Sequence, residues 1–312
     1  MNNNLYGQDL KKRWTLEEIN KMAKSDPQYL INSVESRFNS MIEKVINYIL
    51  VEKKGCKLVL VSGPSSSGKT TFSKIILERL KQKGVLAEVF PFDNFYLGFD
   101  HVPILEDGSR DFEAIEGLDI EGIRKSLIDL IHTGECIIPT YDFALMQPKK
   151  EKEYLKNPKN GIVLAEGLHA INPILTKGIR PKDIVRIYVD IDSGITHKGK
   201  MFFSPKFVRL SRRVLRDYIY RQTLSLKTLK MWENILRGER LYIRPLRRYA
   251  HIRVDTLHEF EVCVMKKETL ELFEDLPPEI KANFAKFIKS LEKFNEIKKD
   301  LVPPNSLTRE FI

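Results

Sequence analysis

The sequence predicts an α/β fold in which a mainly parallel sheet is covered by helices on both faces. Short apolar runs of buried-strand type alternate along the chain with stretches of helical periodicity, which is the pattern of such a sheet. A loop rich in glycine and serine separates the first of these strands from the helix that follows. Helical segments come before and after the alternating region, and we expect them to be N- and C-terminal extensions.

The first extension comprises residues 1–54. Thr15 and Glu18 have the spacing of a capping box, which predicts the start of a helix. A second helix is expected to begin at Pro27, because proline is favoured in the first turn. Apolar residues then recur at three- and four-residue steps, so this helix has one buried face.

The central domain is expected to span residues 55–270. Its predicted strands and helices, in chain order, are strand 57–62, helix 69–83, strand 87–92, helix 119–132, strand 161–165 and strand 185–191. A lid rich in arginine follows at about residues 192–240, with residues 194–200 as a flexible hinge. Residues 271–312 form the C-terminal tail, in which Pro277-Pro278 opens a helix and Pro303-Pro304 ends it.

The composition is that of a globular protein with one strongly basic segment. Of the 312 residues, 42% are hydrophobic and 30% are charged, and no apolar run approaches the length of a membrane span. The N-terminus has no signal-peptide pattern, and the three distant cysteines do not suggest disulfides, so we expect a cytoplasmic protein. No zinc-binding spacing is present.

The basic segment, residues 198–250, carries 15 lysines and arginines against three acids, although the net charge of the chain is only +10. This excess indicates a polyanionic partner, either the phosphates of a nucleotide or a nucleic-acid backbone.

The strongest motif is the loop at residues 63–70, Gly-Pro-Ser-Ser-Ser-Gly-Lys-Thr. It matches the phosphate-binding pattern G-x-x-x-x-G-K-[S/T] between a predicted strand and a predicted helix, so we expect the P-loop NTPase fold. Lys69 should bind the β- and γ-phosphates and Thr70 should coordinate magnesium. The expected nucleotide-binding residues are Gly63, Ser65, Ser66, Ser67, Gly68, Lys69, Thr70 and Thr71. The motif alone does not decide whether the γ-phosphate passes to water or to a substrate hydroxyl.

Two acidic residues follow predicted strands, Asp93 after residues 87–92 and Glu166 after residues 161–165. Ligands bind at the carboxyl ends of parallel strands. Asp93 could therefore accept a proton from an attacking hydroxyl or hold magnesium, and Glu166 could bind the metal directly or through water. Each acid on its own could instead be a turn or capping residue. Tyr141 and Phe143 offer stacking faces for a planar base, or belong to the core.

Arg209, Arg212, Arg213 and Arg216 have the spacing that places them on one face of a helix. Aligned guanidinium groups repel one another unless anions lie nearby, and arginine makes several contacts to one phosphate. We expect a mobile helix that closes over the transferring phosphoryl group. A solvated or salt-bridged helix face is the alternative.

Taken together, these elements resemble the uridine kinase and phosphoribulokinase family of P-loop kinases, over about residues 55–265. The residues that carry the match are the loop, residues 93–96, residues 139–143, Glu166-Gly167 and residues 209–217. The end segments resemble a bacterial subgroup of uridine kinase-like nucleoside kinases. The resemblance implies magnesium-dependent transfer of the γ-phosphate of ATP (or GTP) to the ribose 5′-hydroxyl of a nucleoside. A sugar or another small alcohol is the alternative acceptor.

The resemblance also implies roles for individual residues. Asp93 would be the general base, Lys69, Arg213 and Arg216 would act at the phosphates, and Arg212 would contact the nucleotide. The implied magnesium ligands are Thr70, Asp93 and Glu166. The implied substrate contacts are Tyr96, Phe112, Glu113, Tyr141, Phe143, Met146, Arg213 and Arg216.

Several positions depart from the family pattern, among them Thr223 and Met231, which an ungapped extension past Asp217 places where pyrimidine-specific members have an arginine and a glutamine. Glu113 stands where the family has aspartate, and Met146 stands where pyrimidine-specific members have a histidine that reads the base. A lost hydrogen-bond partner changes specificity strongly. We therefore expect a small nucleoside-like substrate and leave its identity open.

Two other functions are alternatives to the kinase. One is a P-loop ATPase stimulated by nucleic acid, which would use the basic segment. The other is a non-catalytic member that binds nucleotide as a regulator. We expect no membrane partner and no nucleic-acid partner, and we leave a homo-oligomer open.

Overall fold

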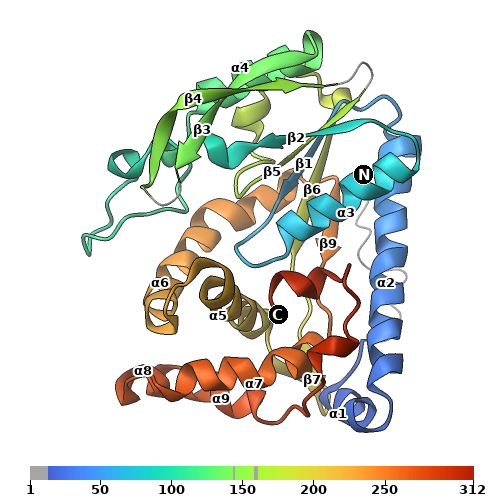
Figure 1. The fold of residues 1–312 in the computed structure, drawn as a ribbon, viewed down its shortest axis with the longest axis vertical. Helices are drawn as coiled ribbons and strands as arrows, with labels where there is room; N and C mark the ends of the chain where they lie inside the picture. The colour runs from blue at the N-terminus through green and yellow to red at the C-terminus, as the bar shows by residue number, and fades with distance from the viewer. Residues whose placement is uncertain (1–12, 143–144, 158–160) are drawn as a thin grey trace.

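The computed structural model describes residues 13–142, 145–157 and 161–312. At its centre is a five-stranded sheet with strand order β2-β5-β1-β6-β9, in which every neighbouring pair is parallel (Figure 1). The strands are β1 (Leu58–Ser62), β2 (Ala87–Pro91), β5 (Ile162–Glu166), β6 (Ile184–Asp190) and β9 (Ile252–Asp255). The predicted fold class and its four predicted strands are thereby confirmed. Strand β9 was not expected from the sequence.

One face of the sheet is covered by helices α2 (Pro27–Asn47) and α3 (Lys69–Gln82). Phe38 and Val45 of α2 share a core with Phe72 of α3 and with Val59 and Val61 of β1. Helix α2 begins at Pro27 and is capped by Asp26, as the sequence predicts. The shorter helix α1 (Leu16–Ser25) begins with the expected capping box, in which Thr15 and Glu18 bond reciprocally.

The opposite face is covered by helix α4 (Ile120–His132), whose buried residues join the inward side chains of β1, β2 and β5. An antiparallel hairpin of β3 (Glu135–Asp142) and β4 (Gln147–Lys156) lies next to α4 (Figure 1). Only a short apolar run before Pro139 pointed to this hairpin, because β4 is almost entirely polar and exposed.

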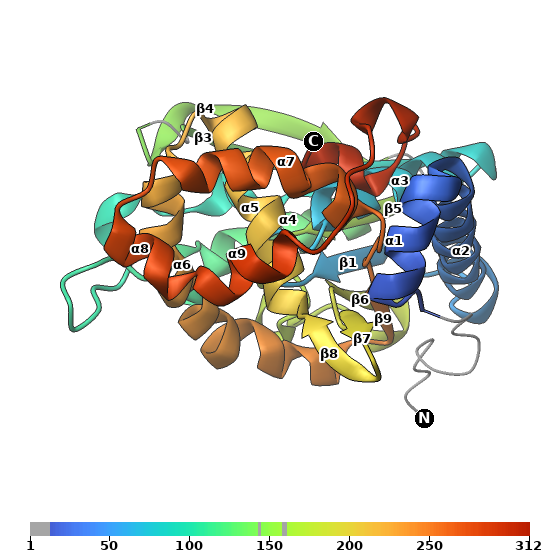
Figure 2. The same cartoon turned by 90° about the horizontal axis from the view of Figure 1, so that it is seen from below.

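A layer of helices formed by later parts of the chain lies beside the sheet, below it in Figure 1 (Figures 1 and 2). It contains α5 (Pro205–Arg221), α6 (Ser225–Gly238), α7 (Glu261–Glu274), α8 (Pro278–Asn283) and α9 (Ala285–Leu291). Helix α5 packs between α6 and α7, and all of them share one hydrophobic core with α1. Among the described residues, no helix has both the length and the apolar character needed to cross a bilayer.

Two expectations for this layer were wrong in detail. Residues 194–200 do not form a flexible loop, because β7 (Ile195–His197) and β8 (Lys200–Phe203) pair as a hairpin whose Phe203 is fully buried. The single helix expected after Pro277-Pro278 is broken at Phe284 into α8 and α9. The break turns α9 so that Phe287 packs against the rings of Phe203 and Phe273.

Candidate functional site

The glycine-rich loop joins the end of β1 to the start of α3, at the carboxyl edge of the sheet. Gly63 must be a glycine, because a Cβ there would lie 1.8 Å from the carbonyl oxygen of Val189. Gly68 precedes α3 in the left-handed conformation (φ +85°), which glycine adopts without strain. The sequence thus fixes a tight turn that ends at a helix N-terminus, which is favourable for binding phosphate.

Side chains from other segments donate hydrogen bonds to the backbone carbonyl groups of this loop. The Ser65 oxygen accepts from Arg209 Nε at 3.0 Å, and the Ser67 oxygen accepts from Thr256 Oγ1 at 2.6 Å. Arg212 Nη1 donates to the Ser66 oxygen at 3.4 Å. These three bonds, together with the bond from the Ser67 amide to the Pro64 carbonyl at 3.4 Å, fix the orientation of the loop peptides. A loop held in this way can present backbone amide groups to a phosphate chain.

Each of the four aligned arginines of α5 is paired with a carboxylate of the protein. Arg209 lies 2.7 Å from Glu239, and Arg212 makes two bonds of 2.6 and 2.8 Å to Glu261. Arg213 and Arg216 lie 3.2 and 3.1 Å from Asp217. Carboxylates of the protein itself therefore offset the repulsion between the aligned arginines.

These pairs correct the picture of α5 as a free lid. Arg212 is fully buried and faces Glu261 and the loop, so in this conformation it supports the loop from behind. Arg213 also donates to the Ser65 hydroxyl. Helix α5 is anchored at several points, and the alternative of a salt-bridged helix face describes this conformation better than a mobile lid.

The two acids at strand ends meet beside the loop. Asp93 lies in a 3₁₀ turn (Phe92–Phe95) directly after β2, and Glu166 is the last residue of β5. The strands are neighbours, with Pro91 paired to Glu166. Thr70 Oγ1 donates to Glu166 Oε1 at 3.1 Å. The loop threonine and both acids therefore lie at one edge of the sheet.

The electrostatics of this edge couple Asp93, Glu166 and Lys69. The pKa of Asp93 is raised to about 6, mainly by burial and also by the nearby charge of Glu166, while Lys69 and Arg221 oppose the shift. Asp93 is exposed to solvent, although protein atoms surround its carboxylate on most sides. Burial lowers the pKa of Lys69, while Glu166 and Asp93 oppose that shift. Lys69 Nζ donates to the Pro64 carbonyl at 3.1 Å.

The donors at this edge suit a magnesium ion. Mg²⁺ is bound by one or two carboxylates together with substrate phosphates and water, and needs no cage made wholly of protein. Within the described ranges no group of three or more His, Cys, Asp or Glu side chains could hold a metal by itself. Thr70, Asp93 and Glu166 provide a hydroxyl and two carboxylates. Both burial and the charge of Glu166 disfavour the ionised form of Asp93, and a bound cation would offset the repulsion between the two carboxylates.

Aromatic and acidic side chains lie near Asp93, where the sequence predicts the acceptor to bind. The rings of Tyr96 and Tyr141 lie 5.8 Å apart. Glu113 is buried, and its Oε2 has no hydrogen-bond partner among the described residues. Burial raises the pKa of Glu113, while Arg213 and Lys69 oppose the shift, so this carboxylate faces the cations of the phosphate site.

The other described residues predicted to contact the substrate are more exposed than Glu113. Phe112 is exposed and packs against Phe99 with ring centroids 6.2 Å apart. Met146 is in the turn between β3 and β4 with a positive φ of 50°, and its carbonyl accepts from the Phe99 amide at 2.9 Å. Phe143 lies outside the described residues.

Sequence reasoning missed the residues that support Glu113. Buried Asp111 accepts from Arg237 and from the Tyr242 hydroxyl, both at 3.0 Å, and thereby ties this loop to the region of α6. A Cβ on Gly238 would lie 2.3 Å from the Cβ of Glu113, so α6 can approach only with glycine there. The only available signal was the Arg-Gly-Glu-Arg run at residues 237–240.

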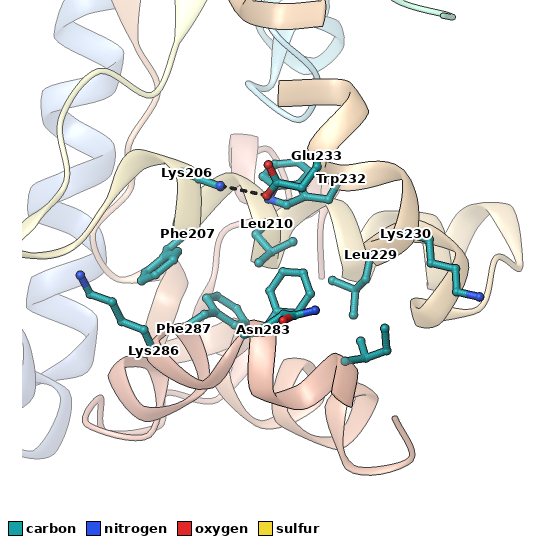
Figure 3. A pocket seen from close by; sticks show the side chains of 12 residues that line it. Lys206, Phe207, Leu210, Leu229, Lys230, Trp232, Glu233, Asn283, Lys286 and Phe287 are labelled. Carbon is teal, nitrogen blue, oxygen red and sulfur yellow. Dashed lines mark hydrogen bonds and ion pairs between the residues drawn. The ribbon is translucent and has the colours of Figure 1, made fainter. Parts of the chain in front are cut away.

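A hollow lies between α5, α6 and the α8–α9 pair, away from the phosphate loop (Figure 3). Its walls are mainly apolar, with Phe207, Leu210 and Phe287 among them, and its charged pair Lys206–Glu233 is closed on itself at 3.2 Å. The convergence of cations, acids and a helix N-terminus occurs at the loop instead. We therefore place the functional site at the loop.

Comparison with known proteins gives a consistent result. Residues 58–263 match the model of the Phosphoribulokinase / Uridine kinase family. The uridine kinase of Clostridium tetani is 28% identical over 196 residues, which cover 62% of this chain and 84% of that protein. The uridine kinase of Ligilactobacillus salivarius is 27% identical over 208 residues, which cover 66% of this chain and 88% of that protein. A solved structure, described as a possible uridine kinase from Bacillus stearothermophilus, aligns at 18% identity with a TM-score of 0.46, covering 70% of this chain and all of that one.

Proposed function

The chain belongs to the phosphoribulokinase and uridine kinase family, and we propose that it is an ATP- and magnesium-dependent kinase that phosphorylates a nucleoside hydroxyl. One observation carries the proposal. The phosphate loop, its Thr70, and the acids Glu166 and Asp93 of two neighbouring strands come together at one edge of the sheet. A site for the phosphate chain thus lies beside a carboxylate that can serve an attacking hydroxyl.

On the donor side, the loop amides and the N-terminus of α3 would bind the phosphate oxygens. Lys69 would neutralise charge on the β- and γ-phosphates, as its place at the start of α3 suggests. Thr70, Glu166 and Asp93 would hold a magnesium ion, which supplies further charge neutralisation when bound. Positioning and electrostatic stabilisation are the main contributions that a protein can make to phosphoryl transfer.

On the acceptor side, Asp93 would accept the proton of the attacking hydroxyl. Its pKa of about 6 leaves the carboxylate ionised at neutral pH and still close to the range suited to proton transfer. Arg213, which is buried between Ser65 and Asp217, would add positive charge near the transferred group.

The proposed acceptor class follows from the aromatic and acidic side chains near Asp93. The Tyr96–Tyr141 pair suits a planar base, and the unpartnered oxygen of Glu113 suits a sugar hydroxyl. A sugar or other small alcohol is the second candidate, because the thioether of Met146 gives a base edge only a weak hydrogen-bond partner.

The proposal is tested by measuring ADP formation with ATP and magnesium across purine nucleosides, pyrimidine nucleosides and sugars. Turnover that depends on a nucleoside supports the proposal, and turnover only with a sugar selects the second candidate. Hydrolysis that no small acceptor stimulates but that DNA or RNA does would refute both.

A further inference from the structure

The C-terminal segment, residues 305–312, lies against the phosphate loop and α3 (Figure 1). Leu307 and Phe311 are fully buried in the core that contains Phe72 of α3. The Leu307 side chain lies so close to Gly68 that a Cβ there would be 2.9 Å from it. The guanidinium of Arg212 stacks over the Phe311 ring at 4.8 Å. The segment is therefore a fixed wall of the loop.

This wall presents Glu310 to the first turn of α3. Thr71 Oγ1 donates to Glu310 Oε2 at 2.6 Å. The segment is also tied to α5, because the Tyr220 hydroxyl donates to the Arg309 carbonyl at 3.3 Å. The charge of Glu310 is among those that oppose the lowered pKa of Lys69, so its field reaches the phosphate-binding lysine.

A threonine hydroxyl has one proton to donate, and here it is donated to a carboxylate. Phosphate oxygens only accept hydrogen bonds, so a phosphate chain beside Thr71 and the Glu310 carboxylate compete for that proton. The two anions also repel each other over a short distance through protein. Both effects oppose the binding of phosphate.

We propose that Glu310 is a positioning residue that weakens donor binding, because it holds the Thr71 hydroxyl and places a negative charge beside the phosphate loop. This inference rests on the proposed function, since it assumes that the loop binds a nucleotide. Glu310 lies outside residues 58–263, the part of the chain that matches the family model, so this control of donor affinity belongs to the added C-terminal segment.

The test compares the affinity of the whole protein and of Glu310→Gln for MgADP by calorimetry. Glutamine keeps the size of the side chain but removes the charge, and its neutral amide oxygen is a weaker acceptor for the Thr71 hydroxyl than the carboxylate is. We expect MgADP to bind about 3- to 10-fold more tightly to Glu310→Gln. Glu292→Gln is the matched control, because it makes the same change in net charge at an exposed residue of the C-terminal tail, outside this wall.

A double-mutant cycle with Thr71→Ala separates this role from a purely structural one. When the hydroxyl is absent, Glu310→Gln should tighten MgADP binding by a smaller factor than in the unmodified protein. If Glu310→Gln binds MgADP no more tightly than the wild type, or if Glu292→Gln shows the same increase in affinity, the proposed role of Glu310 is overturned. Either result would leave the proposed function untouched. Folded wild-type protein that binds no MgADP would refute the proposed function and this inference with it.

Discussion

The hydroxyl of Thr70 donates a hydrogen bond to the carboxylate of Glu166 across 3.1 Å, and this bond joins the first turn of α3 to the end of β5. Glu166 therefore stands between the phosphate loop and Asp93 on the neighbouring strand. The arrangement connects the phosphate site with the acids that would hold a metal.

The first prediction concerns Glu166. Glu166→Gln should keep the bond to Thr70 and lose one anionic ligand, so the magnesium concentration needed for half-maximal activity should rise about 10- to 100-fold. The measurement is a magnesium titration of ADP formation. An unchanged magnesium requirement would remove Glu166 from the metal site.

The second prediction concerns the buried pair of Arg212 and Glu261. Removing the guanidinium in Arg212→Met leaves the Glu261 carboxylate buried and uncompensated, so the free energy of unfolding should fall by about 3–5 kcal/mol. Urea denaturation measures this loss. The control is Lys206→Met, which breaks the exposed pair with Glu233 and should cost less than about 1 kcal/mol. Similar losses in both variants would contradict the anchoring role of Arg212.

The third prediction concerns the contact between α6 and Glu113. Gly238→Ala should lower the free energy of unfolding by about 1–3 kcal/mol, because the new methyl group overlaps the Glu113 side chain. It should also raise the KM of the acceptor more than the KM of ATP. Gly117→Ala is the control, since a Cβ there meets only ordinary contacts at 3.8 Å or more. The prediction fails if the two variants behave alike.

The fourth prediction concerns pH and the buried His258. Burial lowers the pKa of His258 to about 3, with Arg212, Arg37 and Arg13 adding to the shift, while its ordinary value is 6.5. A pKa that is lower in the folded protein stabilises the fold above pH 6.5, and that contribution is lost as the pH falls toward 3. Between pH 6.5 and 5 the loss should be about 2 kcal/mol. The measurement is the difference in unfolding free energy between wild type and His258→Gln across this range, and parallel curves would contradict it.

Local patterns in the sequence predicted the elements that build the site. The loop between β1 and α3, the start of α2 at Pro27 and the strands β2 and β5 each depend on residues near one another in the chain. The acids lie together because neighbouring parallel strands end at the same edge, a rule that holds for any such sheet.

Contacts between distant residues could not be predicted in this way. Glu239 and Glu261, the partners of Arg209 and Arg212, lie far along the chain, so the arginines looked free to meet phosphate. Glu310 and Thr71 are 239 positions apart, and no local pattern in the C-terminal tail indicated their contact. Such pairs depend on how the layers pack, which local periodicity does not encode.

The central claim is that Asp93 serves the acceptor hydroxyl beside a bound phosphate chain. The most direct test measures ADP formation by Asp93→Asn with magnesium, ATP and the best acceptor, alongside its affinity for MgADP. Asp100→Asn is the control, because Asp100 is an exposed acid a few residues further along the chain. We predict that Asp93→Asn loses about 10²- to 10⁴-fold in turnover, while its MgADP affinity at saturating magnesium stays within a few-fold. Wild-type turnover in Asp93→Asn would contradict the account.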